Sequence, residues 1–303
     1  MSKSTYFSNA CDKVAGFRQM GEEFIQKLVI NGRSKSTHEN YLRQMAKMAL
    51  HFGKVPLKFT TSEVEEYLYH LLQKDTDSMS SFKHLVYGLR KLYALFGLEQ
   101  LELSLPPIKG SGKLPVVFSH GEVKQVFQAA KHLSEKVLFG LFYDTGVRIQ
   151  EMTNVRIEDI DLERHQLHVR KTKTKRERYV PVSGHAIRGI TKHLALNSPD
   201  VYLFENPRRK GVPMSETGIR ALLNEALDRT HIKKNASPHT FRHSYATHQL
   251  EAGLDIMSVK GLLGHAHITS TLIYLQVAQL DTAKKRGCMD ILYGEGKRDG
   301  KRT

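Results

Sequence analysis

The chain has 303 residues, and its 46 Lys and Arg against 31 Asp and Glu give a formal net charge of +15. This excess favours a polyanionic partner, DNA or RNA first, while lysine that serves only solubility stays open as the alternative. No apolar run approaches the roughly 20 residues that span a bilayer, and Cys11 and Cys288 show neither metal-ligand nor disulfide-framework spacing, so the sequence predicts a protein of the reducing cytoplasm.

Four stretches of the first hundred residues carry apolar side chains at spacings of three and four, as one buried face of a helix requires. These stretches cover residues 17–28, 41–52, 64–72 and 82–96. Polar start signals at Ser34 and Thr60 precede the second and the third of them. The sequence therefore predicts a small all-α domain over residues 15–98.

Residues 99–117 are predicted to be a linker, because Pro106-Pro107, Gly110 and Gly112 interrupt regular structure there. Directly after this segment, Ser119 and Glu122 have the S-x-x-E spacing of a capping box. This spacing predicts that a helix begins at the start of a second domain, which we place at residues 118–293.

The second domain mixes two kinds of pattern. Strand-like runs at 167–169 and 179–182 surround a turn-forming basic segment, and helical periodicity returns at 187–196, 219–227 and 245–250. No glycine-rich phosphate loop lies between a strand and a helix, so no nucleotide cofactor is expected. Residues 294–303 are polar and are expected to be disordered.

Several side chains of the second domain suit the cleavage of a phosphodiester. That reaction needs a nucleophile, fixed donors on the non-bridging oxygens and a proton source for the leaving oxygen. Arginine suits the oxygens because its planar guanidinium makes paired hydrogen bonds and stays charged. The candidates, in chain order, are Arg148, His239, Arg242, His265 and Tyr274.

Each of these residues also has an ordinary structural reading. Arg148 and Glu151 have the i,i+3 spacing of an ion pair on a helix surface. A lone His-x-x-Arg, such as His239 and Arg242, is a weak motif. Tyr274 lies among leucines and isoleucine and fits a buried core tyrosine. Only their joint order and spacing favours a catalytic role.

In that order and spacing, the residues resemble the catalytic domain of the tyrosine recombinases, the phage-integrase family, in its two-domain, Xer-like form. The segment Thr145–Arg148 is similar to the family's Thr-Gly-Leu-Arg motif, and Leu262–His265 is similar to its Leu-Gly-His motif. The resemblance implies that Tyr274 is the nucleophile and that Glu151 orients the site. It also implies that four side chains bind the scissile phosphate or move protons: Arg148, His239, Arg242 and His265.

The family's remaining catalytic residue is a lysine in a β-turn ahead of a Val-Pro strand. Alignment through residues 176–181 puts this lysine at Lys173, although threonines replace the flanking glycines. Lys171 and Lys175 are close enough in sequence to reach the site if the turn differs. Otherwise these two lysines and Arg176 are expected to contact DNA phosphates.

The resemblance implies a mainly α fold with a small β-sheet in the catalytic domain, arranged as a two-domain DNA clamp. It implies a site-specific recombinase or integrase that cleaves and rejoins DNA through a 3′-phosphotyrosyl intermediate, without a metal or cofactor. The reaction would serve integration, transposition, inversion or resolution, as in mobile elements. The expected partners are double-stranded DNA and a homo-tetramer on two DNA sites, and no membrane. An accessory recombinase or DNA-bending protein stays open.

The expected location is the cytoplasm of a bacterial-type cell, in association with the nucleoid. Two alternatives remain open at this point: a type IB topoisomerase, which uses similar chemistry on one duplex, and a DNA-binding protein without catalysis. An RNA-binding module is disfavoured, because the sequence lacks an RNP-like aromatic motif. The short N-terminal region suggests that no arm-site-binding domain precedes the helical domain.

Overall fold

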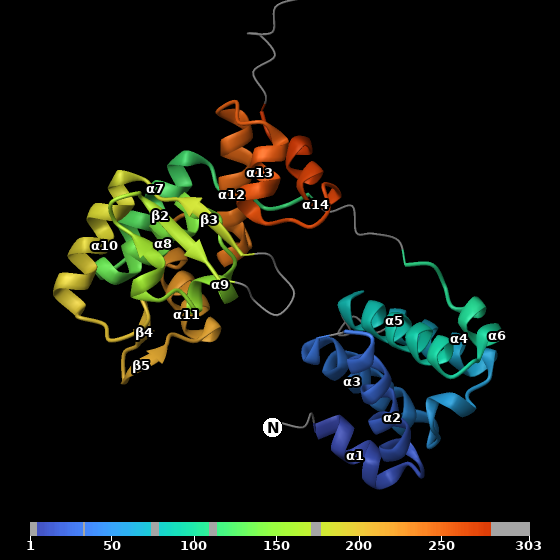
Figure 1. Ribbon diagram of the computed structural model, residues 1–303. Helices are drawn as coiled ribbons and strands as arrows, with labels where there is room; N and C mark the ends of the chain where they lie inside the picture. Colours follow the sequence, from blue (N-terminus) through green and yellow to red (C-terminus); the bar gives the residue numbers. More distant parts are fainter. Residues whose placement is uncertain (1–4, 33, 74–78, 109–113, 171–176, 280–303) are drawn as a thin grey trace, which may run out of the picture. The chain divides into compact units, whose positions relative to one another are not determined.

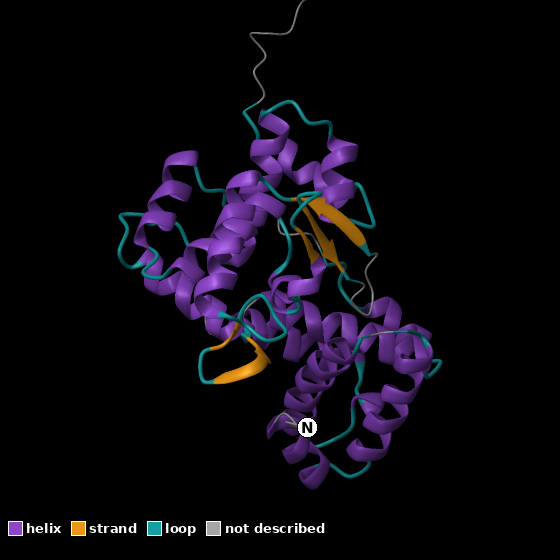
Figure 2. Ribbon diagram, turned by 60° about the vertical axis from the view of Figure 1, so that its left-hand side comes forward, coloured by secondary structure: helices purple, strands orange, loops and turns teal. Residues whose placement is uncertain are grey.

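The computed structural model of the protein describes residues 5–32, 34–73, 79–108, 114–170 and 177–279. The chain forms two compact units, Met1–Gly112 and Lys113–Thr303, each with its own hydrophobic core (Figure 1). In the part of the chain described, every strand belongs to the second unit, and helices make up the rest of the regular structure (Figure 2). The predicted mainly α fold with a small β-sheet is therefore confirmed.

The first unit is helical throughout its described residues. Apolar side chains from α2, α3, α4 and α5 fill its core, and α3 packs against both α1 and α5. The four predicted helices are confirmed as α2 to α5. The elements are α1 (Thr5–Lys13), α2 (Phe17–Ile30), α3 (Lys35–Phe52), η1 (Pro56–Lys58), α4 (Thr61–Gln73), α5 (Met79–Leu95) and α6 (Glu99–Ser104).

Two helices of this unit, α1 and α6, were not among the predicted elements. Helix α6 has six residues, which is too short to display a helical period, and it opens the segment predicted as a linker. Leu105, just after it, is buried in the core, and the Arg90 guanidinium donates a hydrogen bond to the Pro106 carbonyl at 3.1 Å. The first part of the predicted linker is thus packed onto the first unit.

The second unit combines helices with two small antiparallel sheets. Its elements are α7 (His120–Ala129), α8 (Leu133–Thr145), α9 (Ile149–Thr153), η2 (Ile157–Asp159), β1 (Ile160–Asp161), β2 (Gln166–Val169), β3 (Arg178–Pro181), α10 (Gly184–Asn197), β4 (Glu205–Asn206), β5 (Arg209–Pro213), α11 (Glu216–Leu227), α12 (Pro238–Glu251), α13 (Ile256–Leu263), α14 (Thr269–Leu272) and η3 (Ile273–Gln276).

The larger sheet has the strand order β1-β2-β3, and both predicted strands take part in it. Leu167 on β2 pairs with Val180 on β3, and both side chains face the core. The sequence missed β1 and the β4–β5 hairpin. A two-residue strand such as β1 or β4 is too short to show an alternating pattern.

Phe241 on α12 is the centre of the main core of the second unit. Its buried ring lies among four other phenylalanines, with ring centroids at most 6.5 Å apart: Phe118, Phe127, Phe139 and Phe142. The contacts of the Phe241 ring fix the first half of α12 against α7 and α8.

The predicted capping box at the start of α7 is confirmed, since the Glu122 N–H donates to Ser119 Oγ and the Ser119 N–H to the Glu122 carboxylate.

A smaller apolar cluster surrounds the second half of α12. It joins α12 to α13 and to the short turn η3, and Tyr274 is one of its buried members. The buried members are Tyr245, Ala246, Leu250, Val259, Leu263 and Tyr274.

Among the described helices of both units, none has the length and apolar character needed to cross a membrane.

Candidate active site

Arg148 lies at the junction between α8 and α9. Helix α8 ends at Gly146, whose φ of +61° is in the left-handed region, and Arg148 follows with an extended backbone as the N-cap of α9. The expectation that Arg148 stands on a helix face with Glu151 is therefore wrong. Instead, Glu151 in the first turn of α9 reaches back and accepts two hydrogen bonds from Arg148, from its N–H at 2.9 Å and from Nη1 at 3.0 Å.

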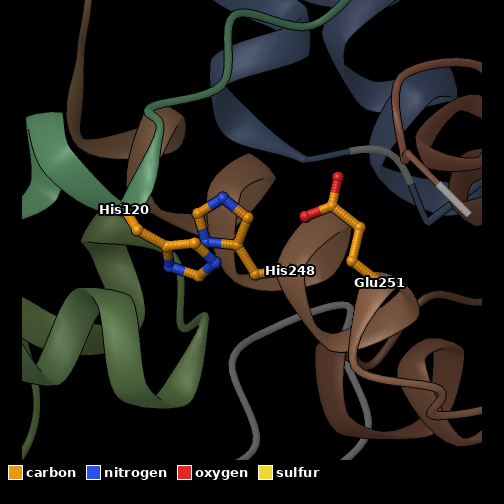
Figure 3. A group of neighbouring side chains, drawn as sticks. All are labelled: His120, His248 and Glu251. Carbon is orange, nitrogen blue, oxygen red and sulfur yellow. The ribbon is translucent and has the colours of Figure 1, made fainter. Parts of the chain in front are cut away.

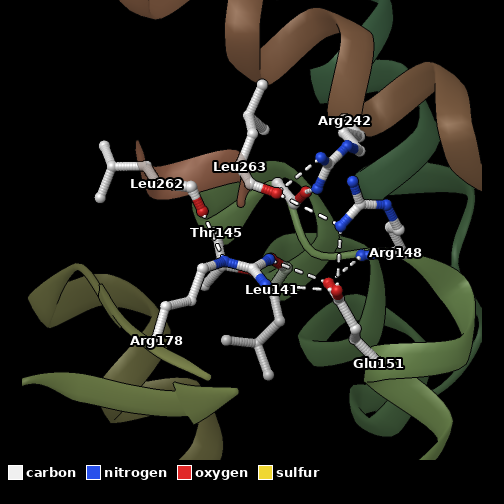
Figure 4. Close-up of polar contacts among 9 residues, drawn as sticks. Leu141, Thr145, Arg148, Glu151, Arg178, Arg242, Leu262 and Leu263 are labelled. Atoms are coloured by element: carbon white, nitrogen blue, oxygen red, sulfur yellow. Dashed lines mark hydrogen bonds and ion pairs between the residues drawn. The ribbon is translucent and has the colours of Figure 1, made fainter. Parts of the chain in front are cut away.

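Glu151 forms a buried ion pair with a second arginine that the sequence did not single out. Its side chain is only 1% exposed, and Arg178 on β3 donates to both carboxylate oxygens, at 2.9 and 3.2 Å (Figure 4). Burial alone raises the pKa of Glu151, but the hydrogen bonds and charge of Arg178, with a further contribution from Arg148, lower it to about 2. The surface-pair alternative for Glu151 is therefore excluded.

Arg178 also joins β3 to the end of α13. Its Nε donates to the Leu262 carbonyl at 2.7 Å. A helix C-terminus carries unsatisfied carbonyls with partial negative charge, so a buried guanidinium is well placed there. Arg178 thus fixes the Leu-Gly-His turn of α13 relative to Glu151 and Arg148.

Arg242 is almost fully buried, at 3% exposure, on α12. It donates to the Gly146 carbonyl at 2.6 Å and to the Leu263 carbonyl at 2.7 Å, and Arg148 donates to the same Leu263 carbonyl at 3.3 Å (Figure 4). Burial, followed by the charge of Arg148, lowers the pKa of Arg242 to about 9. Two guanidinium groups that share one carbonyl oxygen make a preorganised site for an anion.

Tyr274 lies beside these cations. Its side chain is buried, at 2% exposure, and its hydroxyl is 3.1 Å from Nδ1 of His243 on α12. Burial raises the pKa of Tyr274, while the charges of Arg242 and Arg148 and a hydrogen bond from Arg242 oppose that rise. Tyr274 is therefore both a buried core tyrosine and a neighbour of Arg148 and Arg242.

The two predicted histidines reach Tyr274 and the arginine pair from different elements, His239 from the start of α12 and His265 from the turn after α13. The His265 ring stacks on Tyr274, with centroids 6.3 Å apart, and its Nδ1 lies 2.8 Å from the Thr271 hydroxyl. His239, in the first turn of α12, is exposed as a residue, but the protein partly covers its imidazole. This partial desolvation, followed by the charge of Arg242, lowers its pKa. Five of the six predicted catalytic residues thus gather in one region of the second unit.

The sixth residue and its neighbours lie outside the described residues. These are Lys173, the predicted proton donor, with Lys171, Lys175 and Arg176. The strands on either side, β2 and β3, are described, and β3 carries Arg178 into the site.

A separate histidine cluster was not predicted. Ligand atoms of His120 on α7 and of His248 and Glu251 on α12 lie within 4.8 Å of one another (Figure 3). The centroids of the two imidazole rings are 3.9 Å apart with the ring planes tilted by 31°, and Nδ1 of each ring lies near the Tyr143 hydroxyl, at 3.2 Å for His120 and 2.8 Å for His248. Glu251 accepts the N–H of Gln279 at 2.9 Å. Since both Nδ1 atoms and one oxygen of Glu251 have partners in the protein, we interpret the cluster as a brace between helices and assign no metal to it.

We expect Gly146→Ala to destabilise the second unit and disrupt the arginine pair. A Cβ at this position would overlap the Tyr245 ring and lie 3.0 Å from Leu263 Cδ2, in addition to the cost of a positive φ. We expect a loss of more than about 2 kcal/mol in the free energy of unfolding, measured by urea denaturation.

Gly211→Ala is the matched control for this substitution. Gly211 has a similar φ of +70° but nothing within 4 Å of its Cβ position, so it tests backbone strain alone, about 1 kcal/mol. Equal losses for the two variants would show that close packing at Gly146 is unimportant.

Both parts of the chain match models of the phage integrase family. Residues 117–280 match the Phage integrase family, and residues 20–101 match the Phage integrase, N-terminal SAM-like domain. Tyrosine recombinase XerA of Pyrococcus horikoshii is 32% identical over 260 residues, which cover 84% of this chain and 88% of that protein. A tyrosine recombinase of Thermosipho africanus is 29% identical over 273 residues, 84% of this chain and 95% of that protein.

Solved structures of integrases share the fold. A lambda integrase tetramer bound to a Holliday junction superimposes with a TM-score of 0.69, at 17% identity, over 89% of this chain and 79% of that chain. The Tn1549 transposon integrase in complex with transposon right end DNA gives a TM-score of 0.67, at 15% identity, over 89% and 96%. The solved structures show a shared fold, and the sequence matches show that the chain belongs to the phage integrase family: it is a tyrosine recombinase, an enzyme of site-specific DNA recombination that cleaves and rejoins DNA strands.

Proposed function

We propose that Tyr274 is the nucleophile of this recombinase and that Arg148 and Arg242 bind the scissile phosphate. The observation that carries the proposal is the convergence of both guanidinium groups on the Leu263 carbonyl, next to the buried phenol of Tyr274. A phosphate bound there would meet fixed donors that need no rearrangement as charge develops. His239 and His265 complete the set of donors around it.

In the proposed step, the Tyr274 oxygen forms a bond to phosphorus and the bond from phosphorus to the 5′ oxygen breaks. The products are a 3′-phosphotyrosyl link and a strand with a free 5′-hydroxyl. Lys173 supplies the proton that the leaving oxygen takes up. Attack by the 5′-hydroxyl of a partner duplex reverses the step, so that strands are exchanged without net loss of phosphodiester bonds.

The proposed partners are double-stranded DNA and further copies of the chain. Exchange between two duplexes needs four nucleophiles, and the related lambda integrase is a tetramer on a Holliday junction. We therefore propose a homo-tetramer on two DNA sites, at the nucleoid of the cytoplasm, with accessory recombinases or DNA-bending proteins as further partners. The helical unit and the catalytic unit would each grip the duplex, and the net charge of +15 predicts affinity that falls steeply with salt.

Covalent trapping tests this proposal. The protein is incubated with nicked duplexes from the DNA that flanks its gene, and a denaturing gel is examined for a protein–DNA adduct. A nick close to the cleavage position lets the short 5′-hydroxyl fragment diffuse away, so the adduct accumulates. Adduct formation at one defined sequence supports the recombinase; relaxation of plasmids at any sequence would favour the type IB topoisomerase alternative.

We expect Lys173→Ala to slow adduct formation more than Lys171→Ala or Lys175→Ala. Loss of a positioned general acid costs about 10²–10⁴-fold in rate, whereas loss of one backbone phosphate contact mainly weakens binding and reduces its salt dependence. Rates are measured with saturating protein, so that affinity does not contribute. The opposite ranking would move the proton donor to one of the neighbouring lysines.

A further inference from the structure

His243 occupies a position at the site that the six proposed catalytic residues do not explain. It follows Arg242 on α12, is partly buried, and its Nδ1 lies 3.1 Å from the Tyr274 hydroxyl. The two ring centroids are 5.6 Å apart. A contact of this length is a hydrogen bond between an imidazole nitrogen and the hydroxyl that is proposed to attack the phosphate.

The other two imidazoles at the site are placed differently. Nδ1 of His265 is engaged by the Thr271 hydroxyl, and its ring stacks on the Tyr274 ring instead of meeting the hydroxyl edge-on. His239 is exposed, one turn before His243. Within the described part of the site, His243 is therefore the histidine whose ring nitrogen is hydrogen-bonded to the Tyr274 oxygen.

His243 is also held in the form that can accept a proton. Burial, followed by the charges of His239 and Arg242, lowers its pKa to about 4, so the imidazole is neutral at physiological pH and has a lone pair on one ring nitrogen. A phosphate bound between Arg148 and Arg242 would offset part of the positive charge around it. Binding of the substrate therefore makes proton uptake by His243 more favourable.

We infer that His243 is a catalytic residue that takes the Tyr274 proton during cleavage and returns it during rejoining. As the phenol oxygen bonds to phosphorus, its O–H bond breaks and the proton passes to Nδ1 of His243, which becomes an imidazolium. In the reverse step the imidazolium gives this proton back to the departing tyrosine oxygen. The inference rests on the proposed function of Tyr274 and adds its missing proton acceptor.

The test separates activation of the nucleophile from protonation of the leaving group. Adduct formation is measured on an ordinary nicked duplex and on one with sulfur in place of the bridging 5′ oxygen, because a thiolate leaves without needing a proton. We expect His243→Ala to slow the reaction by about 10²-fold or more on both substrates. Lys173→Ala should be slow with oxygen and restored with sulfur.

His243→Asn distinguishes proton transfer from positioning. The asparagine amide keeps a hydrogen-bonding partner for the phenol but cannot take up a proton. We expect His243→Asn to be as slow as His243→Ala and added imidazole to restore part of the rate of His243→Ala. Wild-type rates for His243→Asn would mean that the residue only positions Tyr274, and this would overturn the inference.

Other outcomes are equally decisive. A His243→Ala defect that sulfur removes would assign the residue to protonation of the leaving group and not to activation of Tyr274.

The exposed His185 on α10 supplies a matched control, since His185→Ala should react at the wild-type rate. Melting temperature and DNA binding are measured for every variant, and His243→Asn alone carries the test if His243→Ala does not fold. An adduct formed by Tyr274→Phe would refute the proposed function itself.

Discussion

We expect replacement of Tyr274 by phenylalanine to abolish the covalent protein–DNA adduct and to leave DNA binding intact. Phenylalanine keeps the ring in the apolar cluster between α12 and η3 but removes the oxygen that is proposed to form the phosphotyrosyl bond. Removal of a nucleophile from an enzyme costs at least about 10⁴-fold in rate. We therefore expect no adduct on the denaturing gel under conditions where the wild type forms it.

The same substitution has a small effect on stability, which keeps the activity result interpretable. The hydroxyl makes a hydrogen bond to His243 at 3.1 Å, and such a bond contributes about 1 kcal/mol net. Urea denaturation should show a change of this size, and the salt dependence of DNA binding should not change.

Tyr245→Phe is the matched control. Tyr245 is a buried tyrosine of the same apolar cluster, and burial raises its pKa to about 12. Its substitution removes a phenolic hydroxyl without removing the proposed nucleophile, so adduct formation should persist. Full activity of Tyr274→Phe would assign the nucleophile to another residue and remove the basis for the inference about His243.

Local pattern was enough to predict much of this fold. The spacing of Phe17, Phe24 and Leu28 specified α2, and the Ser119–Glu122 box specified the start of α7, because these signals lie within one or two helical turns. Helix α1 has nine residues, and its apolar stripe is short: it buries Ala10 fully, while Phe7 and Cys11 are only partly buried against the core, so the sequence analysis did not detect it. The β4–β5 hairpin escaped because its strands do not alternate.

The residues of the candidate site likewise fall into two groups, those that sequence motifs identified and those that only the fold revealed. Motif order identified residues that approach one another only in the fold, such as Arg148 and Arg242. It gave no signal for Arg178, which is one of several basic residues in its segment and meets Glu151 across 27 positions of sequence. It gave none for His243, whose contact with Tyr274 spans 31 positions. Such pairings depend on tertiary packing, which a single sequence does not display.

Arg178→Met is expected to be the most destabilising single substitution at the site. It removes the main partner of Glu151, a carboxylate that is 1% exposed, and leaves Arg148 as its remaining cation. Removal of one partner of a buried ion pair costs about 3–5 kcal/mol, because the other charge stays buried without full compensation. Urea denaturation of the full chain should show a loss in this range in the transition of the catalytic unit.

The double variant Arg178→Met with Glu151→Gln tests the cause of this loss. If the buried charge is responsible, neutralising Glu151 should recover a large part of the stability that Arg178→Met removes. Arg220→Ala is the surface control: its pair with Glu216 is exposed on α11, so we expect a change below about 1 kcal/mol. Similar losses for Arg178→Met and Arg220→Ala would contradict the buried-pair argument.

Stability and activity should respond differently in these variants. The double variant restores charge balance but not the hydrogen bond from Arg178 to the Leu262 carbonyl, which fixes the turn that carries His265. It also removes the carboxylate that orients Arg148. We therefore expect a double variant that folds but forms the covalent adduct slowly. Recovery of both stability and rate would mean that Arg178 and Glu151 serve the fold alone, and that Arg148 is positioned by its contact with the Leu263 carbonyl.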